Sequence, residues 1–286
     1  MCNIWYWFCV WLIFGYFVPY NGFGFYLDDV NKVLAVKSNW VKALVVGTTL
    51  LATSGVQAKI SQWSLGVAAS YSPAVYKETP SNRAVIPMVG YEGEHFFMRG
   101  FSAGYRLFPV GTPQNIVFRA VYDPRTLKPS DSDNVDIQKL DEREASILGG
   151  VSYQVITLVG MFEATIGSDI GFKHNGVYGE AAWRLPIRRK GWAITPSIGY
   201  AYNSERINNH LYGVSSDEAN RTTLGEFDAD WDGQYFIGFG GYMHITPNIR
   251  VTGGVRYTNL EGDIEKSPII ESGVNTTANV GITYVF

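Results

Sequence analysis

Residues 277–286 read TANVGITYVF, and this closing stretch decides the fold because its apolar residues recur at every second position. One face carries Ala278, Val280, Ile282 and Tyr284. The opposite face is mostly polar, and successive side chains of a strand point to opposite faces, so the pattern predicts a β-strand with one apolar side. Aromatic residues at the third-last and last positions, Tyr284 and Phe286, are typical of the final strand of an outer-membrane β-barrel. We expect these two residues to act as the assembly signal of such a barrel.

The composition of the 286-residue chain favours the same architecture. Aromatic residues make up 15% of it and glycine occurs 31 times, which suits the aromatic girdles and the curved strands of a barrel. The net charge of −3 gives no reason to expect a nucleic-acid partner. Both cysteines, Cys2 and Cys9, lie at the N-terminus, and the four histidines show no metal-ligand spacing. We therefore expect neither a metal nor another cofactor.

Residues 37–58 have the three parts of a secretory signal peptide. Lys37 and Lys42 supply the positive start, residues 43–52 form a short apolar segment, and residues 56–58 (VQA) form a small-residue cleavage site. The apolar segment is too short for a spanning helix. We expect cleavage between Ala58 and Lys59 and export of the mature chain.

Residues 1–36 do not fit this plan, because they are crowded with aromatic residues and lack a cationic start. We interpret them as a mis-annotated leader, with translation beginning near Leu34 or Val36. The alternative is a membrane anchor over residues 5–20. N-terminal sequencing of the mature protein decides between the two, and a retained Met1 would contradict the first.

Period-two runs fill residues 59–286, which we expect to form one all-β domain, a closed antiparallel transmembrane barrel. The clearest run, 192–203, places Trp192, Ile194 and Ile198 on one face and small or polar residues on the other. Eleven runs are found, whereas bacterial barrels normally have an even number of strands. A turn at Gly100 would divide the run 95–107 and give twelve strands. Ten strands are the alternative, if a short N-terminal run does not span.

The connections between runs fall into two classes. The segments 123–144, 204–230 and 260–273 are long and polar, whereas 108–113, 187–190 and 246–248 are short. Long external loops and short periplasmic turns are the arrangement of outer-membrane barrels. The long loops look too polar to form a core of their own, so we expect them to be solvated.

Six ionisable residues fall on inward-facing positions of the predicted strands. They are Arg119, Glu163, Glu180, Arg184, Arg250 and Arg256. Charges that leave water need partners, so we interpret this set as a lumen charge network of Arg–Glu pairs that stiffens a narrow barrel. The alternative is a selectivity lining for a small anionic or zwitterionic solute.

Several motifs together resemble the MipA/OmpV family, the MltA-interacting outer-membrane proteins. The segment 86–100 (IPMVGYEGEHFFMRG) carries the resemblance first. It continues through 140–143 (LDER), 211–215 (LYGVS), 267–270 (SPII) and the terminal 281–286 (GITYVF), in the same order as in the family. The resemblance covers essentially all of residues 60–286, and residues 1–36 fall outside it.

The resemblance implies an outer-membrane protein of a Gram-negative bacterium that acts as a scaffold and not as an enzyme. Its implied partners are a lytic transglycosylase and a bifunctional penicillin-binding protein of peptidoglycan (murein) remodelling. Outer-membrane lipid and the barrel assembly machinery are further expected partners. The alternatives are a narrow channel for small solutes, an osmotic-response protein, and an adhesin that binds through the loops 123–144 and 204–230.

Overall fold

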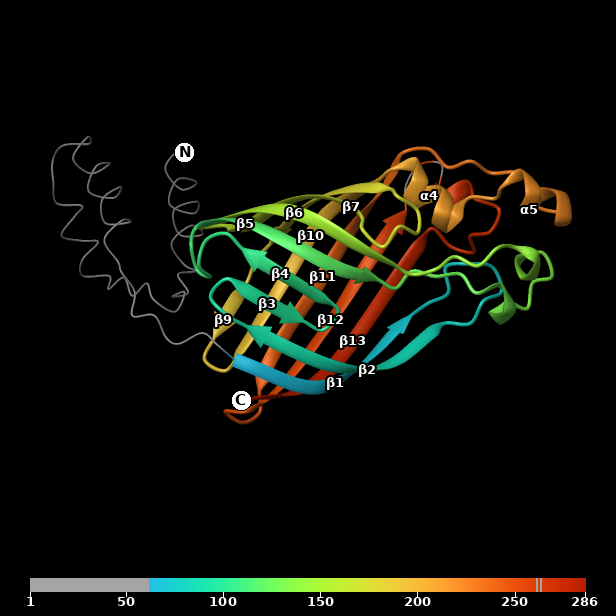
Figure 1. Ribbon diagram of the computed structural model, residues 1–286. Coiled ribbons are helices and arrows are strands. Elements are labelled where there is room, and N and C mark those ends of the chain that lie inside the picture. Colours follow the sequence, from blue (N-terminus) through green and yellow to red (C-terminus); the bar gives the residue numbers. More distant parts are fainter. Residues whose placement is uncertain (1–61, 261, 263) are drawn as a thin grey trace, which may run out of the picture. The chain divides into compact units, whose positions relative to one another are not determined.

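The computed structural model describes residues 62–260, 262 and 264–286, and these form an antiparallel β-barrel (Figure 1). The predicted leader, signal peptide and cleavage site lie outside the described residues. The strands are β1 (Gln62–Ser72), β2 (Asn82–Glu92), β3 (Phe96–Arg99), β4 (Ser102–Arg106), β5 (Gln114–Asp123), β6 (Ser146–Thr157), β7 (Gly160–Asp169), β8 (Val177–Arg184), β9 (Ile187–Arg189), β10 (Trp192–Asn203), β11 (Asp232–His244), β12 (Ile249–Leu260) and β13 (Val274–Val285).

The barrel is closed and has twelve strands, as predicted. β13 pairs with β1, from Ser64 opposite Val285 to Tyr71 opposite Ala278. β8 and β9 both pair with β10, so they are two pieces of one strand. Pro186 lies at the interruption between them, and proline has no backbone N–H to donate to a ladder. The alternative of ten strands is wrong.

The wall alternates as the sequence predicts. The outward residues of β13, Val280, Ile282 and Tyr284, are exposed, whereas Thr283 between them is buried against the lumen. An apolar outer face suits a lipid solvent, and a polar inner face suits a lumen. Within the described part of the chain, no helix is long and apolar enough to cross a membrane.

The turn predicted at Gly100 is confirmed. Gly100 has a φ of +58°, a left-handed conformation that glycine adopts without strain, and it separates β3 from β4. These two strands are the shortest complete strands of the wall, with four and five residues. Figure 1 shows that their hairpin ends well before β2 and β5 do.

The two ends of the barrel differ. One, the turn end, carries short connections at 93–95, 107–113, 158–159, 190–191 and 245–248, together with the C-terminus. The other, the loop end, carries 73–81, 124–145, 170–176, 204–231 and 261–273. The loop-end connections contain η1 (Pro129–Asp131), η2 (Ile137–Lys139), α4 (Glu205–Tyr212), α5 (Ser216–Arg221) and η3 (Ile264–Lys266).

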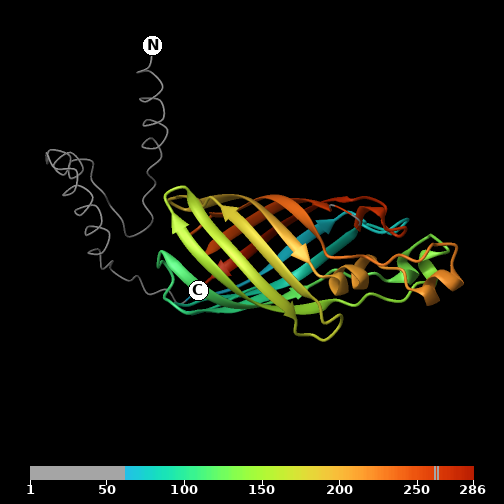
Figure 2. The same cartoon turned by 90° about the horizontal axis from the view of Figure 1, so that it is seen from above.

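The expectation that the long loops are too polar to form a core is wrong. A cluster of buried side chains joins four loop-end connections and their flanks into one folded unit, which we call the cap. Figures 1 and 2 show these connections gathered at one end of the barrel. The members of the cluster are Tyr76, Leu127, Ile137, Leu140, Ile207, Leu211, Tyr212, Val214, Leu260, Ile264, Ile269 and Ile270. These residues are scattered singly among polar ones, so each loop looks hydrophilic until the loops are brought together.

Candidate functional site

Five of the six predicted lumen residues form one continuous ion-pair chain across β5, β7, β8 and β12. Glu163 lies 3.3 Å from the Arg119 guanidinium and 3.2 Å from that of Arg184. Glu180 extends the chain, at 3.3 Å from Arg184 and 3.9 Å from Arg256. The Glu163 side chain is only 3% exposed, so the two arginines supply the positive charge that a buried carboxylate needs.

Arg250, the sixth residue, does not join this chain. Its guanidinium lies 5.9 Å from the centre of the Tyr242 ring, and its buried Nε has no hydrogen-bond partner. No ion pair of Arg250 occurs among the described residues. Arg250 is six residues from Arg256 on the same strand, about 20 Å along it, so the shared inward face does not bring the two arginines together.

A second lumen cluster at the turn end escaped the sequence analysis. Glu92 accepts from Arg106 at 2.5 Å and pairs with Arg99 at 2.9 Å. Both guanidiniums lie over the Phe97 ring, Arg106 at 4.4 Å and Arg99 at 4.9 Å from its centre. The sequence analysis divided the run 95–107 at Gly100 but assigned no inward face to either half, because the two strands have only four and five residues. Counting the alternation outward from the Gly100 turn was the signal that could have placed Arg99 and Arg106 in the lumen.

Together with Arg250, the two lumen clusters contain six arginines and three glutamates. These residues therefore carry more positive than negative charge in this part of the lumen. Large side chains also extend into the lumen beside Arg256. The Arg256 guanidinium lies 3.6 Å from the centre of the Phe236 ring. This ring occupies the space that a side chain at position 199 would need, and Gly199 leaves that space free.

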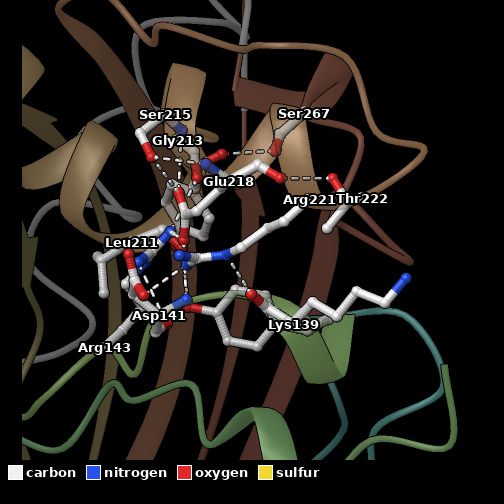
Figure 3. A network of polar contacts seen from close by, with 12 residues as sticks. Lys139, Asp141, Arg143, Leu211, Gly213, Ser215, Glu218, Arg221, Thr222 and Ser267 are labelled. Atoms are coloured by element: carbon white, nitrogen blue, oxygen red, sulfur yellow. Dashed lines mark hydrogen bonds and ion pairs between the residues drawn. The ribbon is translucent and has the colours of Figure 1, made fainter. Parts of the chain in front are cut away.

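A polar network holds the cap together (Figure 3). Glu218 of α5 pairs with Arg143 at 2.7 Å, and both side chains are almost fully buried. Ser215 and Glu218 form a capping box, in which each side chain accepts from the other residue's backbone N–H. Glu218 also accepts from the Asp141 backbone N–H at 2.9 Å. One carboxylate therefore joins the 124–145 loop to the start of α5.

This geometry changes the acidity of the carboxylate. Burial alone would raise the pKa of Glu218, but the backbone N–H groups of Ser215 and Asp141 and the Arg143 guanidinium all favour the ionised form. The resulting pKa lies below the usual range of a glutamate. Glu218 is therefore ionised at neutral pH and bound to the residues that order the cap.

The sequence motifs 140–143, 211–215 and 267–270 meet in this cap. Arg143 donates to the Gly213 carbonyl at 3.2 Å, and Ser267 donates to the Tyr212 carbonyl at 2.6 Å. Ile269 and Ile270 belong to the hydrophobic cluster. The three motifs are thus accounted for by the folding of one structural unit.

A polar crevice of about 740 Å³ opens beside the cap at the loop end. Its lining residues are Lys173, His174, Asn175, Glu205, Arg206, Asn209, His210 and Asp228. The rings of His174 and His210 lie 5.2 Å apart, but His174 Nδ1 accepts from the Gly176 backbone N–H and His210 Nε2 contacts the Glu144 carbonyl. These contacts account for one nitrogen of each ring, so the histidine pair is explained by loop structure.

The turn end presents apolar and basic residues. Leu158 and Val159, at the tip of the β6–β7 hairpin, are 88% and 63% exposed, and Ile245 and Phe108 are also exposed. Arg188 and Arg189 end β9 and Lys190 begins the short connection to β10, and we call these three residues the basic turn. Exposed apolar side chains rimmed by charge are typical of protein interaction sites.

The predicted assembly residues lie at this end as well. Tyr284 points outward from β13, and its ring contacts that of Phe286 at a centroid distance of 5.1 Å. The Phe286 backbone N–H donates to the Trp63 carbonyl of β1 at 3.0 Å. The last residue therefore sits on the seam that closes the barrel, and its role as an assembly signal stays a prediction.

Comparison with known proteins places this geometry in context. The family model described as MltA-interacting protein MipA matches residues 65–286. MltA-interacting protein of Escherichia coli K12 is 28% identical over 246 residues, which cover 86% of this chain and 99% of that protein. Outer membrane protein OmpV of Vibrio cholerae is 25% identical, covering 85% and 96%. Outer membrane protein Omp26La of Vibrio anguillarum is 24% identical, covering 85% and 96%.

Proposed function

The chain belongs to the MltA-interacting protein MipA family, and from this premise we propose that it is a scaffold that binds enzymes of peptidoglycan remodelling. The protein is an outer-membrane β-barrel. In such barrels the short turns face the periplasm and the long loops face outward. The turn end is therefore the surface available to periplasmic enzymes.

The observation that carries the proposal is the apolar hairpin tip of Leu158 and Val159. Two large apolar side chains at the far end of a hairpin can insert into a pocket of a partner, and such anchors dominate binding energy in protein interfaces. The basic turn 188–190 adds electrostatic steering toward an acidic partner surface. Interfacial binding of lipid phosphates is the competing role of that basic turn.

The proposed partners are a lytic transglycosylase and a bifunctional penicillin-binding protein. The relative in Escherichia coli is named for its interaction with MltA, and the second partner follows from the family resemblance. The role is non-enzymatic in this proposal, because the lumen carboxylates Glu92, Glu163 and Glu180 are engaged by arginines.

The test is a pull-down from solubilised membranes with the double variant Leu158→Ser, Val159→Ser. The unaltered protein should recover both murein enzymes, and the double variant should lose most of this recovery. Val135→Ser is the matched control, since Val135 is 64% exposed but lies at the loop end. Repeated recovery of no murein enzyme by the unaltered protein would overturn the scaffold role.

The arginine excess of the lumen supports a second candidate, a narrow channel for small anions. It predicts discrete conductance steps in planar bilayers with a preference for anions. Substituting Arg250, which has no carboxylate partner among the described residues, should reduce that preference. Absence of conductance would remove this candidate and leave the scaffold proposal untouched.

A further inference from the structure

The short β3–β4 hairpin leaves one edge of β2 without a partner. β2 pairs with β1 along its whole length, from Asn82 to Glu92. On its other side it pairs with β3 only over 90–92, and Gly100 adds one bond to the Val89 carbonyl. Among the described residues, no strand pairs with 82–88 on that side. We call this segment the free β2 edge.

The free β2 edge is bordered by other parts of the chain. The Tyr122 backbone N–H donates to the Phe101 carbonyl and fixes the hairpin tip against β5. Toward the loop end, the Asp133 backbone N–H donates to the Glu78 carbonyl, and Ser132 donates to the Lys77 carbonyl. In Figure 1 no strand of the described residues lies between β2 and β5 beyond the end of the hairpin.

This edge lies within the apolar band of the wall. Val85 and Pro87 stand opposite Ala69 and Val67 of β1, between Trp63 toward the turn end and Tyr71 toward the loop end. Val85 is 76% exposed, against 39% for Val89, which lies next to the hairpin. Unpaired backbone N–H and C=O groups are costly in lipid, so something must cover this edge in the membrane.

Pro87 argues against a β-strand as the occupant. The Val89 carbonyl points toward β3, and alternation along the strand turns the backbone of residues 87, 85 and 83 the same way. Proline has no N–H, and proline on an edge is a common device against strand addition. The two remaining free N–H groups, of Arg83 and Val85, therefore lie on the loop-end side of Pro87.

A groove on the outer wall crosses β13, β1 and β2, on the side of β2 away from the free edge. The side chains of Arg83 and Val85 line this groove, whereas their free N–H groups face the edge. The groove has a volume of about 460 Å³, and the small side chains Ala69 and Ala278 lie between the larger Tyr71, Val85 and Val280. Arg83 stands at its loop end, with its guanidinium 5.8 Å from the centre of the Tyr71 ring. In the part of the chain that the structure describes, no carboxylate lies within ion-pair distance of Arg83.

We propose that the groove and the free β2 edge bind a phosphorylated, acylated saccharide of the outer leaflet. An acyl chain lies in the groove, and a headgroup phosphate pairs with Arg83. Headgroup oxygens accept from the N–H groups of Arg83 and Val85. The loop end faces outward, which places Arg83 at the headgroup level of that leaflet and Pro87, which has no N–H, at the level of the acyl chains.

Photocrosslinking tests the position of the lipid. The full chain, carrying a benzophenone amino acid in place of Val85, is reconstituted in nanodiscs that contain lipid A. The control position is Ile198, which also faces lipid but has paired strands on both sides. We expect labelling of lipid A at position 85 to exceed that at 198 severalfold. Equal labelling, or a crosslinked dimer at position 85, would overturn the proposal.

A charge variant tests the chemistry. Arg83→Gln should lower the amount of lipid A retained by the purified protein about fivefold. The substitution removes one charge-assisted contact, whose contribution to binding is reduced by solvent screening at an exposed site. Arg206→Gln on α4 is the matched control, because Arg206 is an exposed arginine at the loop end on a helix that packs near β8 and β10, and this variant should leave lipid A retention unchanged. Heat-dependent gel migration shows whether each variant is a folded barrel. Retention of lipid A by a folded Arg83→Gln variant at the unaltered level would refute the role of Arg83.

Discussion

The wall and the cap are built from the same residue types with opposite orientation. In the wall, Ile198 and Ile282 face outward and the Arg184–Glu163 pair faces inward. In the cap, Ile137 and Ile269 are fully buried and the surface is polar. The surrounding medium explains the difference, because lipid accepts apolar side chains and water does not. In one chain, apolar side chains thus face outward in the wall and inward in the cap, and the change occurs at the loop end of the strands.

The buried Arg143–Glu218 pair gives the strongest way to break the cap alone. Arg143→Leu leaves the Glu218 carboxylate buried without its cation, which should cost the cap about 3–5 kcal/mol. Hydrogen exchange should show loss of protection in 204–221 with the barrel strands unaffected. The exposed Arg221–Asp141 pair is the control, and Arg221→Leu should cost about 1 kcal/mol or less. Equal effects of the two substitutions would show that the pair is not buried in solution.

A charge on the outer face gives the reciprocal test of the wall. Ile198→Lys places an ammonium in the apolar band and should destabilise the barrel by about 2–4 kcal/mol, measured by denaturant titration in vesicles. The inward neighbour Ser197 is the control, because its side chain faces the lumen. If Ser197→Lys proved the more destabilising, the assignment of the two faces would be inverted.

Acid should separate the two regions without any substitution. The pKa of Glu218 in the folded cap is below the usual range of a glutamate. The ionised carboxylate therefore makes its full contribution to cap stability above that usual range, and this contribution is lost as the pH falls through the pKa of the folded state. We expect cap protection in hydrogen exchange to decline below about pH 4. Glu218→Gln should have a weaker cap at pH 7 and a smaller further loss in acid. An unchanged acid response in this variant would assign the effect to other carboxylates.

Removing a single methylene should give the smallest difference in stability loss between the cap and the wall. Ile137→Val in the cap core leaves a small cavity and should cost about 0.5–1.5 kcal/mol. The same change at Ile237, which faces lipid on β11, should be close to neutral because lipid fills the space. Thermal unfolding of the two variants provides the comparison, and a larger loss at Ile237 would contradict it.

The wall was predictable from the sequence because its rule is local. Alternation identifies each strand and its lipid-facing side, and Gly100 identifies the extra turn that makes the strand number even. The same parity placed Arg119, Glu163, Glu180, Arg184 and Arg256 in the lumen, where they form one ion-pair chain. The alternation tells which face of a strand a residue lies on but not its position along the barrel axis. For this reason Arg250 was grouped with residues that it does not contact.

The cap was not predictable because its rule is non-local. Tyr76, Leu127, Leu211 and Ile269 come from four different connections, and none belongs to a periodic run in its own loop. Their burial depends on contacts between segments far apart in the sequence, such as the hydrogen bond from the Tyr76 hydroxyl to the Leu211 carbonyl. Only the assembled barrel brings these segments to one end.

The seam between β1 and β13 has a kinetic consequence. The seam pairs Ser64 with Val285, so β1 and β13 each have a strand on only one side until they pair with each other. Until that moment the chain presents two open strand edges, which are prone to aggregate and slow to find each other across such a long separation. A nascent barrel of this design therefore needs its two edges shielded during the whole of its insertion, and the seam near Trp63 and Phe286 marks the moment at which that protection can end.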